Sequence, residues 1–313
     1  METRELRPIV SRLFAGCAAR TTRVGIEQEL LVADRLGKTV PVARLRAAMT
    51  RCRLVSPYLG FEPGGQLELS LPPAADPASA EAQLRVAVRD VRDHLDRIGV
   101  RLMAEPADSR PEREVPLRLR SARYLRMQAH FDTVGPAGRR MMRRTASTQV
   151  CLDWWPGQAG AEQWRALNLA APFLAARFAR SRGPRSRLAT WLAVDPARTA
   201  FDDRLLRGDD PVAAYVDLAR RATRFVDGAA DHLTTLFPPV RPRGSYLEVR
   251  FLDAQQPAQV EHVASTLAGV VYDDERRRRV LHHLEPLAGR LDELWAAAAS
   301  GELAEDEHQA AAA

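Results

Sequence analysis

The chain has 313 residues, a length that allows one large domain or two modest ones around a buried core. Hydrophobic residues make up 46% and charged residues 27%, and no run of about 18 apolar residues occurs, so we expect no membrane span. The formal net charge is +6, but nearly every basic residue is an arginine, Lys38 being the only lysine. This usage is typical of a GC-rich genome, so we expect no nucleic-acid partner.

The three cysteines, Cys17, Cys52 and Cys151, are scattered and odd in number, which favours reduced thiols over a disulfide framework. The first residues lack the apolar core of a signal peptide. Both observations predict a cytoplasmic protein.

Helices and strands mix without the regular alternation of a doubly wound fold. In chain order, the patterns predict a helix at 5–19, a strand at 24–32, a helix at 41–50, strands at 53–60 and 66–71, a helix at 78–98, a strand at 100–105, helices at 121–131 and 137–143, a strand at 146–153, helices at 162–180 and 211–227, a strand at 245–252, and helices at 256–272 and 274–299. This order favours an α+β fold around an antiparallel sheet. We expect residues 1–313 to form a single domain, with a frayed acidic and Ala-rich tail at 300–313.

Four of the predicted strands have one polar and one apolar face, because side chains two apart share a face of a strand. The polar faces carry Gly25, Glu27 and Glu29; Gln66, Glu68 and Ser70; Ser147, Gln149 and Asp153; and Tyr246, Glu248 and Arg250. If these strands share a sheet, its polar face collects Glu27, Glu29, Glu68 and Glu248, with Glu62 at the rim.

Two interpretations of this glutamate-lined face are open. One-sided antiparallel sheets do expose polar residues to water, so the face could simply be solvated. However, like charges on neighbouring strands destabilise a sheet, and clustered carboxylates therefore need a counter-charge. Magnesium is typically held by a few carboxylates and by substrate phosphates, so we favour a magnesium–nucleotide site.

Glycines and arginines lie beside the predicted acids. Gly64 and Gly65 permit a tight turn before the Glu68 strand, and they either only make that turn or also lie beside a ligand. Arg241, Arg243 and Arg250 converge near Glu248, where a guanidinium can bind carboxylate or phosphate oxygens. No zinc, dinucleotide or P-loop motif accompanies them.

At these residues the chain resembles the glutamate–cysteine ligases, most closely the plant and actinobacterial branch that includes the first enzyme of ergothioneine biosynthesis. The segments that carry the resemblance are 25–29, 61–70, 145–153 and 232–255. It implies a glutamine-synthetase-like curved antiparallel sheet with helices packed on its outer face. It also implies that ATP activates the side-chain carboxylate of glutamate as a γ-glutamyl phosphate, which an amine then attacks.

The resemblance also implies roles for individual residues. Magnesium ligands would be Glu27, Glu29, Glu62, Glu68 and Glu248; catalytic residues would be Arg250, Arg243 and Glu68; and residues that bind ATP or substrate would be Gln66, Gln149, Thr145, Arg187, Arg198 and Arg241. The cofactors would be ATP and Mg²⁺, and the partners would be small molecules, glutamate with cysteine or another amine.

The chain is also shorter than is usual in that family. The shortening falls in two places, the segment from the Tyr215 helix to His232 and the C-terminal part. That region would shape the acceptor pocket. The sequence therefore predicts a glutamate–cysteine ligase and leaves two alternatives open, a γ-glutamyl ligase with another amine acceptor and a non-catalytic homologue that binds nucleotide or amino acid.

Overall fold

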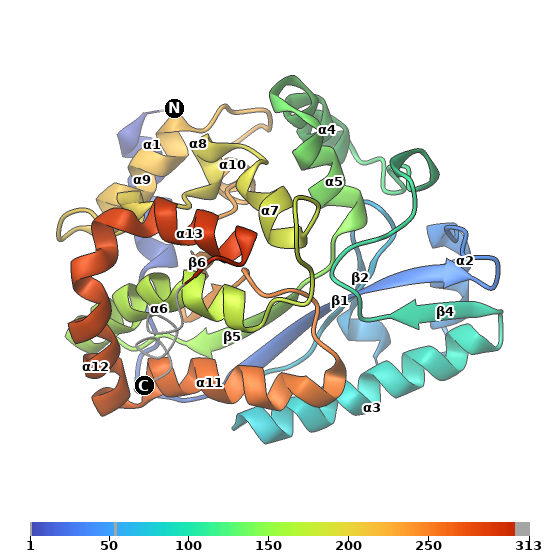
Figure 1. Cartoon of the computed structure of the whole chain (residues 1–313), viewed down its shortest axis with the longest axis horizontal. Helices are drawn as coiled ribbons and strands as arrows, with labels where there is room; N and C mark the ends of the chain where they lie inside the picture. The colour runs from blue at the N-terminus through green and yellow to red at the C-terminus, as the bar shows by residue number, and fades with distance from the viewer. Residues whose placement is uncertain (1, 53–54, 304–313) are drawn as a thin grey trace.

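A seven-stranded antiparallel sheet forms the centre of the computed structural model, which describes residues 2–52 and 55–303 (Figure 1). Its strands are β1 (Val24–Asp34), β2 (Leu59–Phe61), β3 (Leu67–Ser70), β4 (Val100–Met103), β5 (Thr148–Asp153), β6 (Val240–Pro242) and β7 (Tyr246–Val249). The order is β2-β3-β1-β5-β7-β6, and β4 pairs with the second half of β1. The prediction of an α+β fold around an antiparallel sheet is confirmed.

Helices surround this sheet in the described part of the chain. They are α1 (Thr3–Leu13), α2 (Val42–Met49), α3 (Pro77–Asp96), α4 (Ala122–Val134), α5 (Pro136–Arg144), α6 (Gly157–Arg177), α7 (Arg187–Leu192), α8 (Pro196–Thr199), α9 (Pro211–Arg221), α10 (Ala229–Leu233), α11 (Val260–Tyr272), α12 (Asp274–Leu284) and α13 (Leu291–Ser300). Short 3-10 turns lie at Ser56–Tyr58, Glu112–Glu114, Asp203–Leu205, Pro257–Gln259 and Glu285–Arg290.

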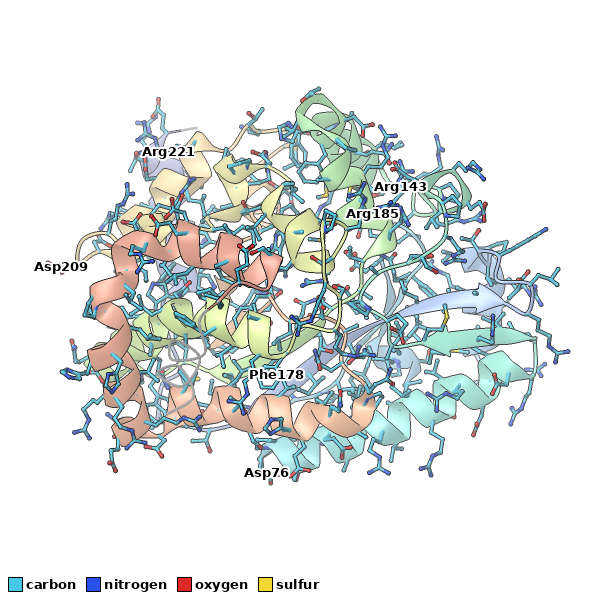
Figure 2. The ribbon with its side chains drawn as sticks, viewed as in Figure 1. Asp76, Arg143, Phe178, Arg185, Asp209 and Arg221 are labelled. Atoms are coloured by element: carbon cyan, nitrogen blue, oxygen red, sulfur yellow. The ribbon has the colours of Figure 1, made fainter. Side chains whose placement is uncertain are left out.

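The apolar face of the sheet packs against long helices. Ile26, Leu69, Val150 and Leu247 are almost completely buried on this face. The helix α3 contacts β1 and β4, while α11 contacts α3 and β5 (Figure 1). The helix α3 begins where Asp76 accepts a hydrogen bond from the backbone N–H of Ser79 at 2.7 Å (Figure 2). The expected layer of helices on the outer face is therefore present.

The polar face of the sheet lies under shorter helices from the middle of the chain. The helices α4 and α5 form a hairpin, and α7 packs on α5 (Figure 1). The main hydrophobic core runs from Leu6 in α1 to Ala298 in α13. This continuity supports our proposal that the chain is one domain.

The structure differs from the predicted elements in four places. The helix expected at 5–19 is α1, which ends at Leu13, before Gly16 with its left-handed φ of 71°. The helix expected at 274–299 breaks into α12 and α13 around Pro286, because proline has no N–H to donate and disfavours a helical residue before it. In the stretch 183–245 the sequence predicted only the helix at 211–227, which is α9. The structure also has α7, α8, α10 and β6 there. The strand expected at 53–60 is wrong over Ser56–Tyr58, which form a 3-10 turn because Pro57 has no N–H for a strand ladder, and β2 begins only at Leu59. Residues 53–54 lie outside the described part, as does most of the tail at 300–313.

Candidate functional site

The register of the strands places the polar side chains opposite one another. Glu29 on β1 pairs with Glu68 on β3, and Glu27 pairs with Gln149 on β5. Further along the sheet, Glu248 on β7 lies between Cys151 on β5 and Arg241 on β6. The alternation seen in four separate segments therefore produces one continuous polar surface.

This surface forms the floor of a cavity of about 410 Å³. The cavity is lined by all the predicted metal ligands (Glu27, Glu29, Glu62, Glu68 and Glu248) and by Gln66, Thr145, Gln149, Arg187, Arg241, Arg243 and Arg250. Of the site residues expected from the sequence, only Arg198 is not among its lining residues.

Three carboxylates at the β3 end of the cavity form no ion pair with an arginine, lysine or histidine of the described residues. Glu29, Glu62 and Glu68 each offer an oxygen atom, and these atoms lie within 4.8 Å of one another. Burial, and next the charge of Glu62, raises the pKa of Glu68 to about 9. Burial, and next the charge of Glu29, raises the pKa of Glu62 to about 7. Such a cluster binds either protons or a cation near neutral pH.

Glu248, at the other end, is surrounded by guanidinium groups. Arg250 donates a hydrogen bond to its carboxylate, Arg243 lies 3.4 Å from it and Arg241 lies 3.7 Å from it. Burial alone would raise the pKa of Glu248, but the three arginines, Arg250 foremost, hold that pKa below its usual value. Glu248 is thus a charged carboxylate with its counter-charges already in place.

Glu27 and Gln149 connect these two ends. The amide oxygen of Gln149 accepts a hydrogen bond from Arg250 at 3.2 Å, and its amide nitrogen lies 3.4 Å from Glu29. Burial, and next the charge of Glu248, raises the pKa of Glu27 to about 7. A ligand in the cavity therefore meets acids on one side and a chain of arginine donors on the other.

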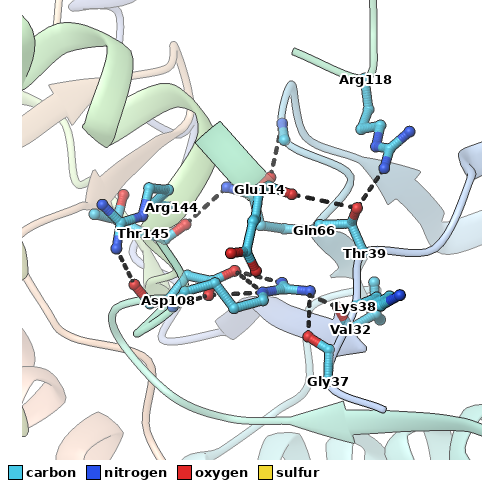
Figure 3. A network of polar contacts seen from close by, with 12 residues as sticks. Val32, Gly37, Lys38, Thr39, Gln66, Asp108, Glu114, Arg118, Arg144 and Thr145 are labelled. Carbon is cyan, nitrogen blue, oxygen red and sulfur yellow. Dashed lines mark hydrogen bonds and ion pairs between the residues drawn. The ribbon is translucent and has the colours of Figure 1, made fainter. Parts of the chain in front are cut away.

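The turn before β3 holds Glu62 and Glu68 in place. Gly65 has a left-handed φ of 93°, and a Cβ on Gly64 would come within 2.1 Å of the carbonyl oxygen of Arg143. Gln66 accepts from the N–H of Gly64 at 2.9 Å and donates to the carbonyl of Thr145 at 2.9 Å (Figure 3). The glycines thus make both a turn and a close backbone contact, and the Gln66 amide fixes that turn to the end of α5.

The predicted arginines of α7 and α8 lie in different places. Arg187 is buried beside the cavity, where it donates to the carbonyls of Phe251 and Arg250 at 3.2 and 2.9 Å and stacks on Trp191. Arg198 is fully buried outside the cavity lining. It donates to Asp195 at 2.7 Å and to the carbonyls of Thr223 and Thr235 at 2.6 and 3.1 Å. These internal bonds occupy the guanidinium of Arg198, so its expected contact with substrate is not part of our proposal.

Sequence reasoning missed several residues of this site. Cys151 lies on the polar face of β5, which strand alternation alone could have shown. Its Sγ lies 3.9 Å from Glu27. Arg123 and Tyr124 of α4 line the cavity from above, together with an apolar group of side chains. Their position depends on how α4 packs over the sheet, and no local pattern indicates that packing.

The donor set fits a hard divalent cation. Magnesium prefers carboxylate oxygens and keeps several other oxygen ligands from water or phosphate, and Glu29, Glu62 and Glu68 supply such oxygens around one point. Among the described residues, no helix is long and apolar enough to cross a membrane.

The chain is similar to known glutamate–cysteine ligases. The model of the glutamate–cysteine ligase family 2 matches residues 23–312. A protein described as glutamate–cysteine ligase EgtA from Mycolicibacterium smegmatis is 32% identical over 276 residues, which cover 74% of this chain and 64% of that relative. A chloroplastic glutamate–cysteine ligase from Medicago truncatula is 25% identical, over 71% of this chain and 52% of that relative.

Among solved structures, a glutamate–cysteine ligase from Francisella tularensis in complex with AMP overlays with a TM-score of 0.47 at 15% identity, over 94% of this chain and 81% of that one. The chain spans a little under two thirds of the length of the actinobacterial relatives that it matches. The family match covers nearly the whole sequence, and the chain belongs to the glutamate–cysteine ligase family 2.

Proposed function

We propose that this chain is an ATP-dependent γ-glutamyl ligase that joins the side-chain carboxylate of glutamate to an amine. Cysteine is the first acceptor to consider, because the relatives from Mycolicibacterium smegmatis and Medicago truncatula are described as glutamate–cysteine ligases. The product would then be γ-glutamylcysteine, and the similarity to EgtA makes ergothioneine biosynthesis the pathway that we propose.

One observation carries this proposal. Half-buried carboxylates that form no ion pair with the described residues and arginines that are paired with Glu248 share one cavity on the same sheet face. Phosphoryl transfer requires positioning and charge neutralisation more than a covalent nucleophile. Acids that hold a cation and arginines that face the transferred group provide both requirements.

In this proposal the acids hold Mg²⁺ and the arginines hold the anionic groups. Glu29, Glu62 and Glu68 form one ligand set, and Glu27 and Glu248 extend it along the sheet. When bound, Mg²⁺ would neutralise charge on the phosphates of ATP. These acids line the floor of the cavity, where the triphosphate would bind with the ion.

Arg250 and Arg243 have different surroundings in the cavity. Arg250 is held by Glu248 and Gln149, so its guanidinium is positioned before any substrate binds, and we propose that it faces the transferred phosphoryl group. The side chain of Arg243 is 41% exposed, which places it at the open side of the cavity, where it can meet a phosphate as ATP enters.

A non-catalytic homologue would need only to bind its ligand. The clustered acids argue against that alternative, because a protein that only binds nucleotide or amino acid need not keep this many carboxylates with raised pKa values together. A γ-glutamyl ligase with another acceptor would belong to the same chemical class. We propose the cytoplasm, which supplies ATP and reduced thiols, as the compartment.

Product analysis tests the proposal. Purified protein is incubated with glutamate, ATP and Mg²⁺ and with single amines, and phosphate release and product mass are measured. We expect phosphate release that depends on both glutamate and an amine, together with a γ-glutamyl amide of the corresponding mass. Absence of phosphate release with every amine contradicts the enzyme proposal.

A further inference from the structure

A thiol, a carboxylate and an imidazole meet away from the cavity, where the end of α2 packs on α3 (Figure 1). They belong to Cys52, Asp90 and His94, none of which lines the cavity on the sheet face. Each side chain offers one ligand atom, and the three atoms lie within 4.8 Å of one another. Sulfur, oxygen and nitrogen are thus combined here, whereas the cluster on the sheet face consists of carboxylates alone.

The backbone holds all three side chains in place. Asp90 and His94 are four residues apart in α3, so they share one face of that helix, and this is the spacing with which a helix chelates a metal ion. Cys52 follows α2, where its N–H donates to the carbonyl of Met49 at 2.9 Å and its own carbonyl accepts from the N–H of Ser56 at 2.9 Å. The completely buried thiol is therefore fixed against α3.

The distances within the cluster suit a tetrahedral ion. The Sγ of Cys52 lies 2.9 Å from Oδ2 of Asp90, and Nδ1 of His94 lies 3.3 Å from Oδ1 of Asp90. Zinc, with tetrahedral angles and bonds of about 2.0 to 2.3 Å, needs ligand atoms about 3.5 Å apart. Both distances are close to that spacing, so small rotations of the side chains would complete it.

Asp90 is paired with a thiol and an imidazole and not with an arginine. Its ion-pair contact is with His94, and no arginine or lysine of the described residues forms one with it. The thiol of Cys52 is a weak donor. Burial, and next the hydrogen bond to Asp90, raises the pKa of Cys52 to about 12, so the thiol keeps its proton until a cation replaces it. Thiolate, carboxylate and neutral imidazole together carry two negative charges, which one divalent ion balances.

We infer that Cys52, Asp90 and His94 form a zinc site between α2 and α3. The combination of sulfur, nitrogen and oxygen ligands favours Zn²⁺ over Mg²⁺, which prefers oxygen alone. On binding, Sγ bonds to the ion as a thiolate and its proton passes to solvent, while His94 in its Nε2–H tautomer offers the lone pair of Nδ1. Asp90 also lines a surface groove of about 470 Å³, from which water can supply the fourth ligand.

This site would act on stability and not on the ligation chemistry. The ion would fasten the end of α2 to α3, and the side chains of Asp90 and His94, 23% and 15% exposed, leave it a way in from solvent. The inference is independent of the proposed γ-glutamyl ligation, because no residue of the sheet face takes part in it.

Cobalt, a spectroscopic substitute for zinc, tests the site. Co²⁺ is titrated into the metal-free full-length protein at pH 8, and the thiolate-to-cobalt charge-transfer band in the near ultraviolet is measured. The carboxylate cluster on the sheet face cannot give this band, because it has no sulfur. We expect wild type to show the band and Zn²⁺ to remove it by competition. We also expect Zn²⁺ to raise the Tm of wild type.

Three variants locate the ion. Cys52→Ser should abolish the band and the rise of Tm with Zn²⁺, whereas Cys17→Ser, which changes another free cysteine, should leave both as they are. His94→Gln keeps the thiol, and we expect it to weaken Co²⁺ binding at least about tenfold, because even a change next to a metal ligand costs that much. Circular dichroism shows whether each variant is folded, and His94→Gln carries the test if Cys52→Ser is not.

Each contrary result overturns the inference. Absence of the band in wild type means that the three side chains form only a hydrogen-bonded cluster. A band that survives in Cys52→Ser and is lost in Cys151→Ser places the ion beside Glu27 on the sheet face. Unchanged Co²⁺ binding in His94→Gln removes the imidazole from the site. None of these results affects the ligase proposal, which phosphate release tests separately.

Discussion

The two ends of the polar sheet face carry the same residue type in opposite electrostatic states. At the β7 end, Glu248 has Arg250, Arg243 and Arg241 around it, and its pKa is held below the usual value. At the β3 end, Glu68 has mainly other carboxylates as neighbours, and its pKa rises to about 9. Glu248 is thus balanced by arginines, whereas Glu68 has no ion-pair partner among the described residues, and this difference locates the proposed metal site.

The largest expected effect is on activity at the β3 end. Glu68→Ala removes an oxygen of the proposed metal site, and we expect kcat to fall by at least about a hundredfold, with the fold unchanged. Steady-state phosphate release together with a circular dichroism spectrum measures both effects. Glu261→Ala, an exposed change on α11, is the control. Turnover that persists in Glu68→Ala means that the metal assignment is wrong.

The second expected effect is on stability, and it distinguishes the two ends. Glu248→Gln leaves the largely buried Arg241 and Arg250, and the more exposed Arg243, without their counter-charge, so we expect it to lower the free energy of unfolding by about 3 kcal/mol. Glu68→Gln at pH 8 should change it little, because glutamine resembles the protonated acid that the raised pKa implies. Urea unfolding of both variants in metal-free buffer gives the comparison, and equal losses would contradict it.

Much of this site could be predicted from the sequence, because strand alternation is a local signal. It placed Glu27, Glu29, Glu68 and Glu248 on one face, and the register confirms that they meet. Strand alternation could not test the prediction that Arg198 binds substrate, because Arg198 lies on the helix α8. Whether a buried arginine binds a ligand or an internal aspartate depends on tertiary packing, and here it binds Asp195.

The helical half of the cavity was less predictable for the same reason. The stripe of Tyr124, Met127 and Phe131 resembles any core-facing side of a helix, and only the packing of α4 over the sheet turns part of it into a cavity wall. The break at Pro286, in contrast, had a local signal that the sequence analysis passed over.

A third expected effect concerns pH. The carboxyls of Glu27, Glu62 and Glu68 have folded-state pKa values of about 7, 7 and 9, above the ordinary 4.5 of the unfolded chain. Their protonated forms favour the fold, so their contribution is fully present below about pH 4.5 and is lost as the pH rises to 9. We expect Tm of the metal-free protein to fall between pH 6 and pH 9.

Magnesium should reverse that trend, because a bound cation favours the ionised carboxylates. Thermal unfolding with and without Mg²⁺ across this range measures the difference. We expect the stabilisation by Mg²⁺ to be larger at pH 9 than at pH 6. The same stabilisation at both values would contradict the assignment of the raised pKa values to the metal ligands.

The smallest expected effect comes from one added methyl group. A Cβ on Gly60 would lie 2.9 Å from a carboxylate oxygen of Glu68, so Gly60→Ala should displace that carboxylate while the backbone stays in place. We expect Mg²⁺ affinity to fall by about tenfold or less, as for other changes next to a metal ligand. Gly289→Ala, where the new Cβ meets nothing within 4 Å, is the matched control. Identical affinities in the two variants would show that the Glu68 carboxylate does not bind the ion.

Direct cation binding tests the central claim that Glu29, Glu62 and Glu68 form a divalent metal site. Mn²⁺, a spectroscopic substitute for Mg²⁺, is titrated into wild-type protein and Glu68→Gln at pH 8 without nucleotide, and free Mn²⁺ is read from its electron paramagnetic resonance signal. We predict that wild type binds Mn²⁺ and that Glu68→Gln binds it at least about tenfold more weakly. Equal binding by the two proteins, or none by wild type, would contradict the claim.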